Sequence, residues 1–133
     1  MGFLKRLIAT SKTHQSAEDL IELVQWNALN SEEELEAMEL KSKERPQFLF
    51  KNSPRCGVSS MVLRRFERQS NELIDGADFY QIDVIGSRVL SNQIADRYSV
   101  IHQSPQLLII RNGEAVFDDS HYGILDCELA SFL

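Results

Sequence analysis

The chain has 133 residues, of which 43% are hydrophobic, so it is long enough for one domain that buries a core without disulfide bonds. Its net charge of −6 argues against nucleic acid as a partner, because phosphate backbones bind proteins through an excess of Lys and Arg. We therefore interpret residues 1–133 as a single domain that does not bind nucleic acid.

The two cysteines, Cys56 and Cys127, are too few for a disulfide framework and are typical of a reducing compartment. The apolar run near the start is too short for a signal peptide, and Arg6 stands where a myristoylation signal requires Ser or Thr. No stretch of the sequence reaches the length that crosses a membrane. We expect a cytoplasmic protein without a membrane partner.

The first half of the chain alternates between helical and extended patterns. Residues 16–21 predict a short helix, and residues 23–26 predict an extended piece. Residues 31–34 (Ser-Glu-Glu-Glu) form a capping box, which predicts a helix over residues 32–43 that ends before Pro46. The side chains that this helix is expected to turn inward are those of Leu35, Met38 and Leu40.

A buried strand and a helix follow. Residues 47–51 form a short apolar run that is typical of a buried strand. The next helix begins near Cys56, and its apolar residues recur at helical spacing on one side. The residues expected on that side are Val58, Met61, Val62 and Phe66.

The second half repeats the pattern, with a strand over residues 79–84, a helix over residues 87–98 and a strand over residues 107–110. Asn112-Gly113 then predicts a hairpin to residues 115–117, followed by a closing helix over residues 124–133. The inward residues expected in these two helices are Val89, Leu90, Ile94, Tyr98, Leu125, Leu129 and Phe132. The order βαβαβαββα predicts an α/β fold, with a mixed central sheet flanked by helices on both faces.

Cys56 is the strongest candidate for chemistry, because it lies where the second strand gives way to a helix. A thiol in the first helical turn faces unpaired backbone N–H groups and the positive end of the helix dipole, which favour the thiolate. The thiolate is the nucleophilic form. Three residues later, where a dithiol oxidoreductase has its second cysteine, the chain has Ser59. The sequence therefore indicates a monothiol site.

Basic residues gather around Cys56. Residues 43–68 have seven of them against Glu44 and Glu67, a local charge of +5, and the seven are Lys43, Arg45, Lys51, Arg55, Arg64, Arg65 and Arg68. One interpretation is a solvated helix face. The other is a positive field that stabilises the thiolate and attracts an anionic thiol substrate, with Arg55 as the first candidate and Lys51 as the second.

The order of the elements, the cysteine at a strand-to-helix turn and Pro105 at the start of a strand together resemble the thioredoxin fold. More narrowly, three segments resemble the monothiol bacilliredoxin family of the YtxJ type. They are residues 50–59 (Phe-Lys-Asn-Ser-Pro-Arg-Cys-Gly-Val-Ser), residues 102–106 (His-Gln-Ser-Pro-Gln) and residues 120–122 (Ser-His-Tyr). The resemblance covers roughly residues 20–133. One departure is Gly57, since members often have proline after the cysteine.

The resemblance implies a thiol–disulfide oxidoreductase that removes bacillithiol, a cysteine-glucosamine-malate thiol, from S-thiolated client proteins. Bacillithiol would be a co-substrate, with no cofactor and no metal. Cys56 is similar to the family's nucleophile and Pro105 to the thioredoxin-type cis-proline beside it. The backbone of Ser104 would pair with the substrate, and Arg55 and Lys51 complete the expected substrate site.

Alternatives remain for the function and for three side chains. The chain could be a thioredoxin-fold adaptor that binds proteins without turnover, or a monothiol oxidoreductase that uses glutathione. Cys127 fits a buried inert thiol better than a resolving one. His102 and His121 fit either proton transfer or structural hydrogen bonding. Neither has the spacing to a second ligand that a metal site requires.

Overall fold

The structure, a computed structural model, describes residues 23–133, so the helix expected over residues 16–21 lies outside the described residues. Within this part of the chain, strands form one mixed five-stranded sheet in the order β1-β3-β2-β4-β5. The strands are β1 (Trp26–Ala28), β2 (Gln47–Asn52), β3 (Asp78–Asp83), β4 (Gln106–Arg111) and β5 (Glu114–Ser120). β3 pairs in parallel with β1 and β2, whereas β4 pairs antiparallel with β2 and β5. The predicted mixed sheet is confirmed.

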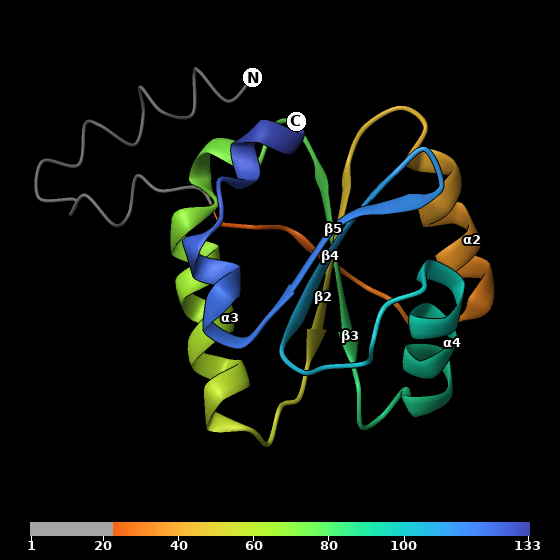
Figure 1. Cartoon of the computed structure of the whole chain (residues 1–133), viewed down its shortest axis with the longest axis horizontal. Coiled ribbons are helices and arrows are strands. Elements are labelled where there is room, and N and C mark those ends of the chain that lie inside the picture. The colour runs from red at the N-terminus through yellow and green to blue at the C-terminus, as the bar shows by residue number, and fades with distance from the viewer. Residues whose placement is uncertain (1–22) are drawn as a thin grey trace, which may run out of the picture.

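Helices cover both faces of the sheet (Figure 1). Helix α3 (Gly57–Gln69) lies on one face, together with the 3₁₀ segments η2 (Asn71–Leu73), η3 (His121–Asp126) and η4 (Leu129–Phe132). Helices α2 (Glu32–Lys41) and α4 (Arg88–Tyr98) lie on the other face. The expected α/β layering is therefore present.

No helix in residues 23–133 is long and apolar enough to cross a membrane.

Each face of the sheet has its own hydrophobic core, because side chains alternate along every strand. On the α3 face, Phe48, Phe50 and Phe79 pack against Val62 and Phe66 of α3. On the opposite face, residues of α2 and α4 pack against the intervening strand residues, and this second core comprises Leu29, Leu35, Met38, Leu49, Ile82, Leu90, Ile94, Tyr98, Leu108 and Ile110. β2 contributes to both cores and is buried along its whole length.

Two helical residues expected to point inward are exposed. Leu40 in α2 is 64% exposed, although Leu35 and Met38 are buried as predicted. Leu40 comes five residues after Leu35, which rotates it by about 140° around a helix with 3.6 residues per turn. Val89 is 72% exposed for a similar reason, since it is one residue away from the buried Leu90 in the first turn of α4.

The predicted closing helix over residues 124–133 is wrong, because the structure has η3 and η4 there instead. They are separated at Cys127, whose backbone is extended (φ −98°, ψ 148°). Ile124 and Leu129 are both buried in the core on the α3 face. A straight α-helix would turn two residues at this spacing about 140° apart. The break lets both side chains enter the same core.

The hairpin predicted at Asn112-Gly113 is confirmed. Both residues have positive φ (53° and 79°), the backbone that an Asn-Gly turn between twisted strands adopts. The hairpin also contacts Ser42 at the carboxyl end of α2. The N–H of Asn112 donates to the carbonyl of Ser42 (2.8 Å), and the N–H of Gly113 donates to the Oγ of Ser42 (3.0 Å). This contact ties β4 and β5 to α2.

We expect Leu35→Ala to lower the free energy of unfolding by about 2–5 kcal/mol, because it leaves a cavity in the core between α2 and the sheet. Leu40→Ala on the same helix is the matched control, and it should change stability by less than about 0.5 kcal/mol. Urea unfolding of both variants measures the difference. Equal losses would contradict the inward face assigned to α2.

Candidate active site

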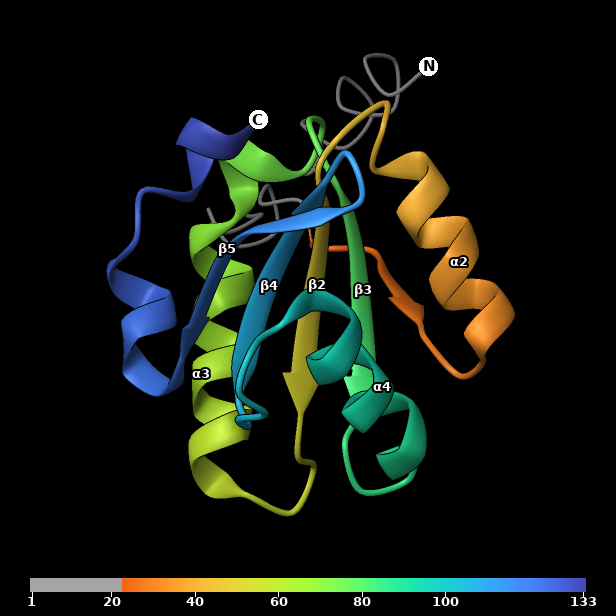
Figure 2. The same cartoon turned by 45° about the vertical axis from the view of Figure 1, so that its right-hand side comes forward.

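The candidate site lies at the end of the sheet where the interior strand β2 ends and its neighbour β4 begins (Figure 2). In the antiparallel pairing of these strands, Lys51 lies opposite Gln106. The loop after β2 leads to Cys56, and the residues directly before β4 are Ser104 and Pro105. The register therefore brings the two sequence-predicted segments of the site to the same end of these two strands.

Cys56 is the N-cap residue of α3. Its backbone is extended (φ −99°, ψ 122°), its N–H donates to the carbonyl of Ser53 (3.0 Å), and its carbonyl accepts from Ser60 (3.1 Å). The first turn of α3 has no acidic residue, and the thiol is half-buried. Backbone N–H groups of a first turn stabilise an anion at the N-cap, and a thiolate there acts as a nucleophile. The helix predicted to begin near Cys56 therefore does begin there.

Ser59, which stands where a dithiol site has its second cysteine, is completely buried. Its Oγ accepts a hydrogen bond from the backbone N–H of Ser53 (3.2 Å). This bond closes the loop between β2 and Cys56 over the first turn of α3. The residue has a structural role that spacing alone does not reveal, and it supplies no resolving thiol.

Backbone contacts fix the segment that precedes β4. The Ser104–Pro105 peptide bond is cis, as the resemblance implied. The carbonyl of Pro105 accepts from the N–H of His121 (3.0 Å), which has a positive φ of 56°. Gln106 Nε2 donates to the carbonyl of Ile101 (2.9 Å). Within residues 23–133 the backbone N–H and C=O of Ser104 have no hydrogen-bond partner, so they are free to pair with a bound chain.

The assignment of Lys51 to substrate binding is wrong. Its side chain is fully buried on the face covered by α4, where Nζ lies 3.0 Å from the carbonyl oxygen of Ser91 and 3.1 Å from Nδ1 of His102. A Lys in the penultimate position of an apolar strand resembles a solvent-facing strand end in sequence. However, alternation along β2 places Lys51 on the same face as the buried Leu49, a signal that could have been used.

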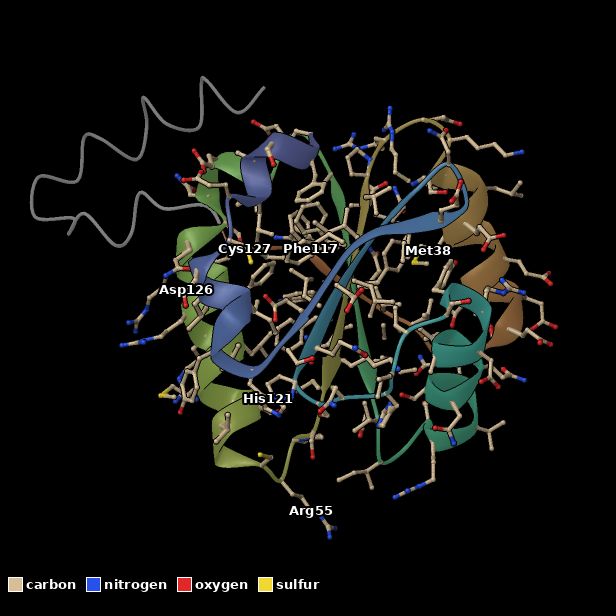
Figure 3. The ribbon with its side chains drawn as sticks, viewed as in Figure 1. Met38, Arg55, Phe117, His121, Asp126 and Cys127 are labelled. Atoms are coloured by element: carbon tan, nitrogen blue, oxygen red, sulfur yellow. The ribbon has the colours of Figure 1, made fainter. Side chains whose placement is uncertain are left out.

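Arg55 is exposed, and its side chain extends away from the body of the protein (Figure 3). Arg64, Arg65 and Arg68 are also exposed, on the outer side of α3. None of these four arginines forms an ion pair with another described residue. The side chains are therefore solvated, and their charge stays available to an anionic ligand.

Cys127 lies in a different environment. Its Sγ donates to the carbonyl of Gly123 (3.1 Å) and approaches Asp119 Oδ2 (3.5 Å). Burial raises the pKa of the Cys127 thiol, and the hydrogen bond and charge of Asp119 and the charge of Asp126 raise it further. Figure 3 shows Cys127 well away from Arg55, the neighbour of Cys56. The structure thus favours an inert thiol at Cys127.

The described residues contain no cluster of three or more potential metal ligands.

Comparisons with known proteins agree with this geometry. The family model of Monothiol bacilliredoxin BrxC matches residues 27–129. A solved structure of a proposed oxidoreductase with a thioredoxin fold is 31% identical, with a TM-score of 0.68 over 80% of this chain and 91% of that chain. The expected thioredoxin-like fold is confirmed.

More distant solved structures share the fold alone. The thioredoxin of Malassezia sympodialis is 15% identical, with a TM-score of 0.69 over 90% of this chain and 97% of that chain. A Schistosoma mansoni thioredoxin is 21% identical, with a TM-score of 0.66 over 82% of this chain and 96% of that chain.

We expect Ser59→Ala to destabilise the protein by about 1–3 kcal/mol, because it leaves the N–H of Ser53 without its buried acceptor. Ser60→Ala, one residue further along α3, is the control for the change in helix propensity. Urea unfolding compares the two. If the two variants lose the same stability, the Ser53–Ser59 bond does not hold the loop.

Proposed function

The chain belongs to the monothiol bacilliredoxin family, and we propose that it removes bacillithiol from mixed disulfides on client proteins through Cys56. Family membership and the 31%-identical oxidoreductase support thiol oxidoreductase activity. The observation that carries the finer proposal is the half-buried thiol at the N-cap of α3, with Ser59 in place of a resolving cysteine. Clients in the cytoplasm and a small thiol would be the partners.

The proposed reaction is one thiol–disulfide exchange. The Cys56 thiolate attacks the bacillithiol sulfur of the mixed disulfide, forming a Cys56–bacillithiol disulfide and breaking the bond to the client. The client cysteine leaves as a thiolate and takes a proton from water. A second bacillithiol thiolate then attacks the bacillithiol sulfur of this disulfide, which forms the symmetrical bacillithiol disulfide and releases Cys56 as a thiolate. Neither step requires a metal or a cofactor.

Substrate binding is assigned to Ser104 and Pro105, the two residues directly before β4. The backbone N–H and C=O of Ser104, which have no partner within residues 23–133, can pair with an extended segment of the substrate just before β4 begins. Main-chain pairing of this kind tolerates different client sequences, because it does not depend on their side chains. Ser104 and Pro105 thus supply orientation, and Cys56 supplies the chemistry.

The trapping experiment uses a protein mixed disulfide that carries bacillithiol and an otherwise identical one that carries glutathione. Mass spectrometry should find bacillithiol on Cys56 of the wild-type protein and none on Cys127. Cys56→Ser should abolish release of the small thiol, and Cys127→Ser should leave it unchanged.

The glutathione substrate decides between the alternatives. Faster transfer of glutathione than of bacillithiol to Cys56 would support a glutathione-using oxidoreductase. Absence of any adduct on Cys56, with the client still bound by the protein, would support the non-catalytic adaptor.

Arg55 is proposed to attract the malate carboxylates of bacillithiol, because it is exposed beside Cys56 and has no ionic partner within residues 23–133. We expect Arg55→Gln to slow release of bacillithiol by about fivefold at most, the size typical of exposed ion pairs, and the loss should shrink as salt is added. Arg65→Gln, which removes an exposed charge from the outer side of α3, is the control. An equal effect of Arg55→Gln on release of an uncharged small thiol would refute the proposed contact.

A further inference from the structure

Lys51 forms a buried polar cluster beneath the loop that leads to Ser104 and Pro105. Its Nζ lies 3.0 Å from the carbonyl oxygen of Ser91 in α4 and 3.1 Å from Nδ1 of His102. The side chain of Lys51 is 0% exposed, and no carboxylate among the described residues forms an ion pair with it. A buried charge without an ionic partner is costly, so these few hydrogen bonds are its compensation.

The chemistry of the two groups determines which one donates. An ammonium group has N–H donors and no acceptor, so Nδ1 of His102 must accept and cannot have a proton. A neutral imidazole that lacks the proton on Nδ1 has it on Nε2. Burial lowers the pKa of Lys51 to about 8, which leaves the ammonium form predominant at neutral pH. The Ser91 hydroxyl lies 3.4 Å from the same Nδ1, a longer and weaker contact, so Lys51 is the main group that selects one tautomer of His102.

The charges that face His102 favour its neutral form. Burial lowers the pKa of His102, and the positive charges of Lys51 and Arg88 lower it further. His102 as a whole is exposed, whereas Lys51, which contacts its Nδ1, is buried. His102 is two residues before Ser104, and the bond from Gln106 Nε2 to the carbonyl of Ile101 closes the loop that contains both.

We propose that Lys51 is a positioning residue that holds His102 in the Nε2–H tautomer, so that this N–H donates to an oxygen of the substrate bound at Ser104 and Pro105. The acceptor would be a carbonyl or carboxylate oxygen of the small thiol or of the client backbone. The substrate contact rests on the proposed oxidoreductase function, whereas the effect of Lys51 on His102 does not. A neutral donor of this kind would bind without adding a further charge to the site.

The first test reads the tautomer directly, by nitrogen-15 NMR of the imidazole rings at neutral pH without substrate. In the wild-type protein, His102 should show a protonated Nε2 and an unprotonated Nδ1. Lys51→Met, which keeps an unbranched chain of similar length, should shift His102 toward a mixture of tautomers. His121, which has no contact with Lys51, is the internal reference and should not change. A His102 with its proton on Nδ1, or one unaffected by Lys51→Met, would overturn the assignment.

The second test measures turnover and does not depend on whether Lys51→Met folds. His102→Leu removes the donor from an exposed position, whereas His102→Gln retains a side-chain N–H. We expect His102→Leu to raise KM for the bacillithiol mixed disulfide about five- to tenfold with little change in kcat, the effect of losing one hydrogen bond. His102→Gln should restore most of the affinity.

The outcomes of the two tests separate the claims. Equal KM values for the wild type and His102→Leu would overturn the substrate contact. Loss of kcat alone would also contradict it, because the proposed bond acts in binding. A wild-type protein with no turnover would refute the proposed function and the substrate contact together, while the NMR measurement would still decide the role of Lys51.

Discussion

The antiparallel pairing of β2 with β4 is the contact on which the rest of the structure depends. β2 lies between β3 and β4 and is buried throughout, so its register is set by the cores on both faces of the sheet. A slip by one residue would turn Phe48 and Phe50 to the wrong face. Lys51 lies opposite Gln106, so the chain leaves β2 toward Cys56 at the same end of the β2–β4 pair where Ser104 and Pro105 precede β4. The site is therefore a consequence of strand register.

The two cysteines lie in contrasting positions within one fold. Cys56 lies at the N-cap of a 13-residue helix, at the positive end of the helix dipole, and no acidic side chain occupies the first turn. Cys127 lies between two short 3₁₀ segments, and its Sγ meets a carbonyl oxygen and a carboxylate. Backbone donors favour the thiolate, whereas backbone and side-chain acceptors favour the thiol. This contrast supports the assignment of the chemistry to Cys56 alone.

Much of the fold could be predicted from the sequence, because hydrophobic periodicity and turn residues are local signals. The capping box at Ser31, the hairpin at Asn112-Gly113 and the start of α3 at Cys56 were all recognisable in this way. The closing helix was not, since the break at Cys127 depends on a core that buries Ile124 and Leu129 together. The role of Lys51 was missed for a related reason. Its partners come from α4 and from the loop before β4, and no local pattern links these segments.

The central claim is that Cys56 and the Ser104–Pro105 segment form one site for a small thiol, and the most direct measurement is NMR of the protein with bacillithiol attached through a disulfide to Cys56. The account predicts nuclear Overhauser effects between bacillithiol protons and residues 102–105, together with shifted amide signals in the first turn of α3. Signals near Cys127 should stay unchanged. A bacillithiol moiety that shows no contact with residues 102–105 would contradict the account.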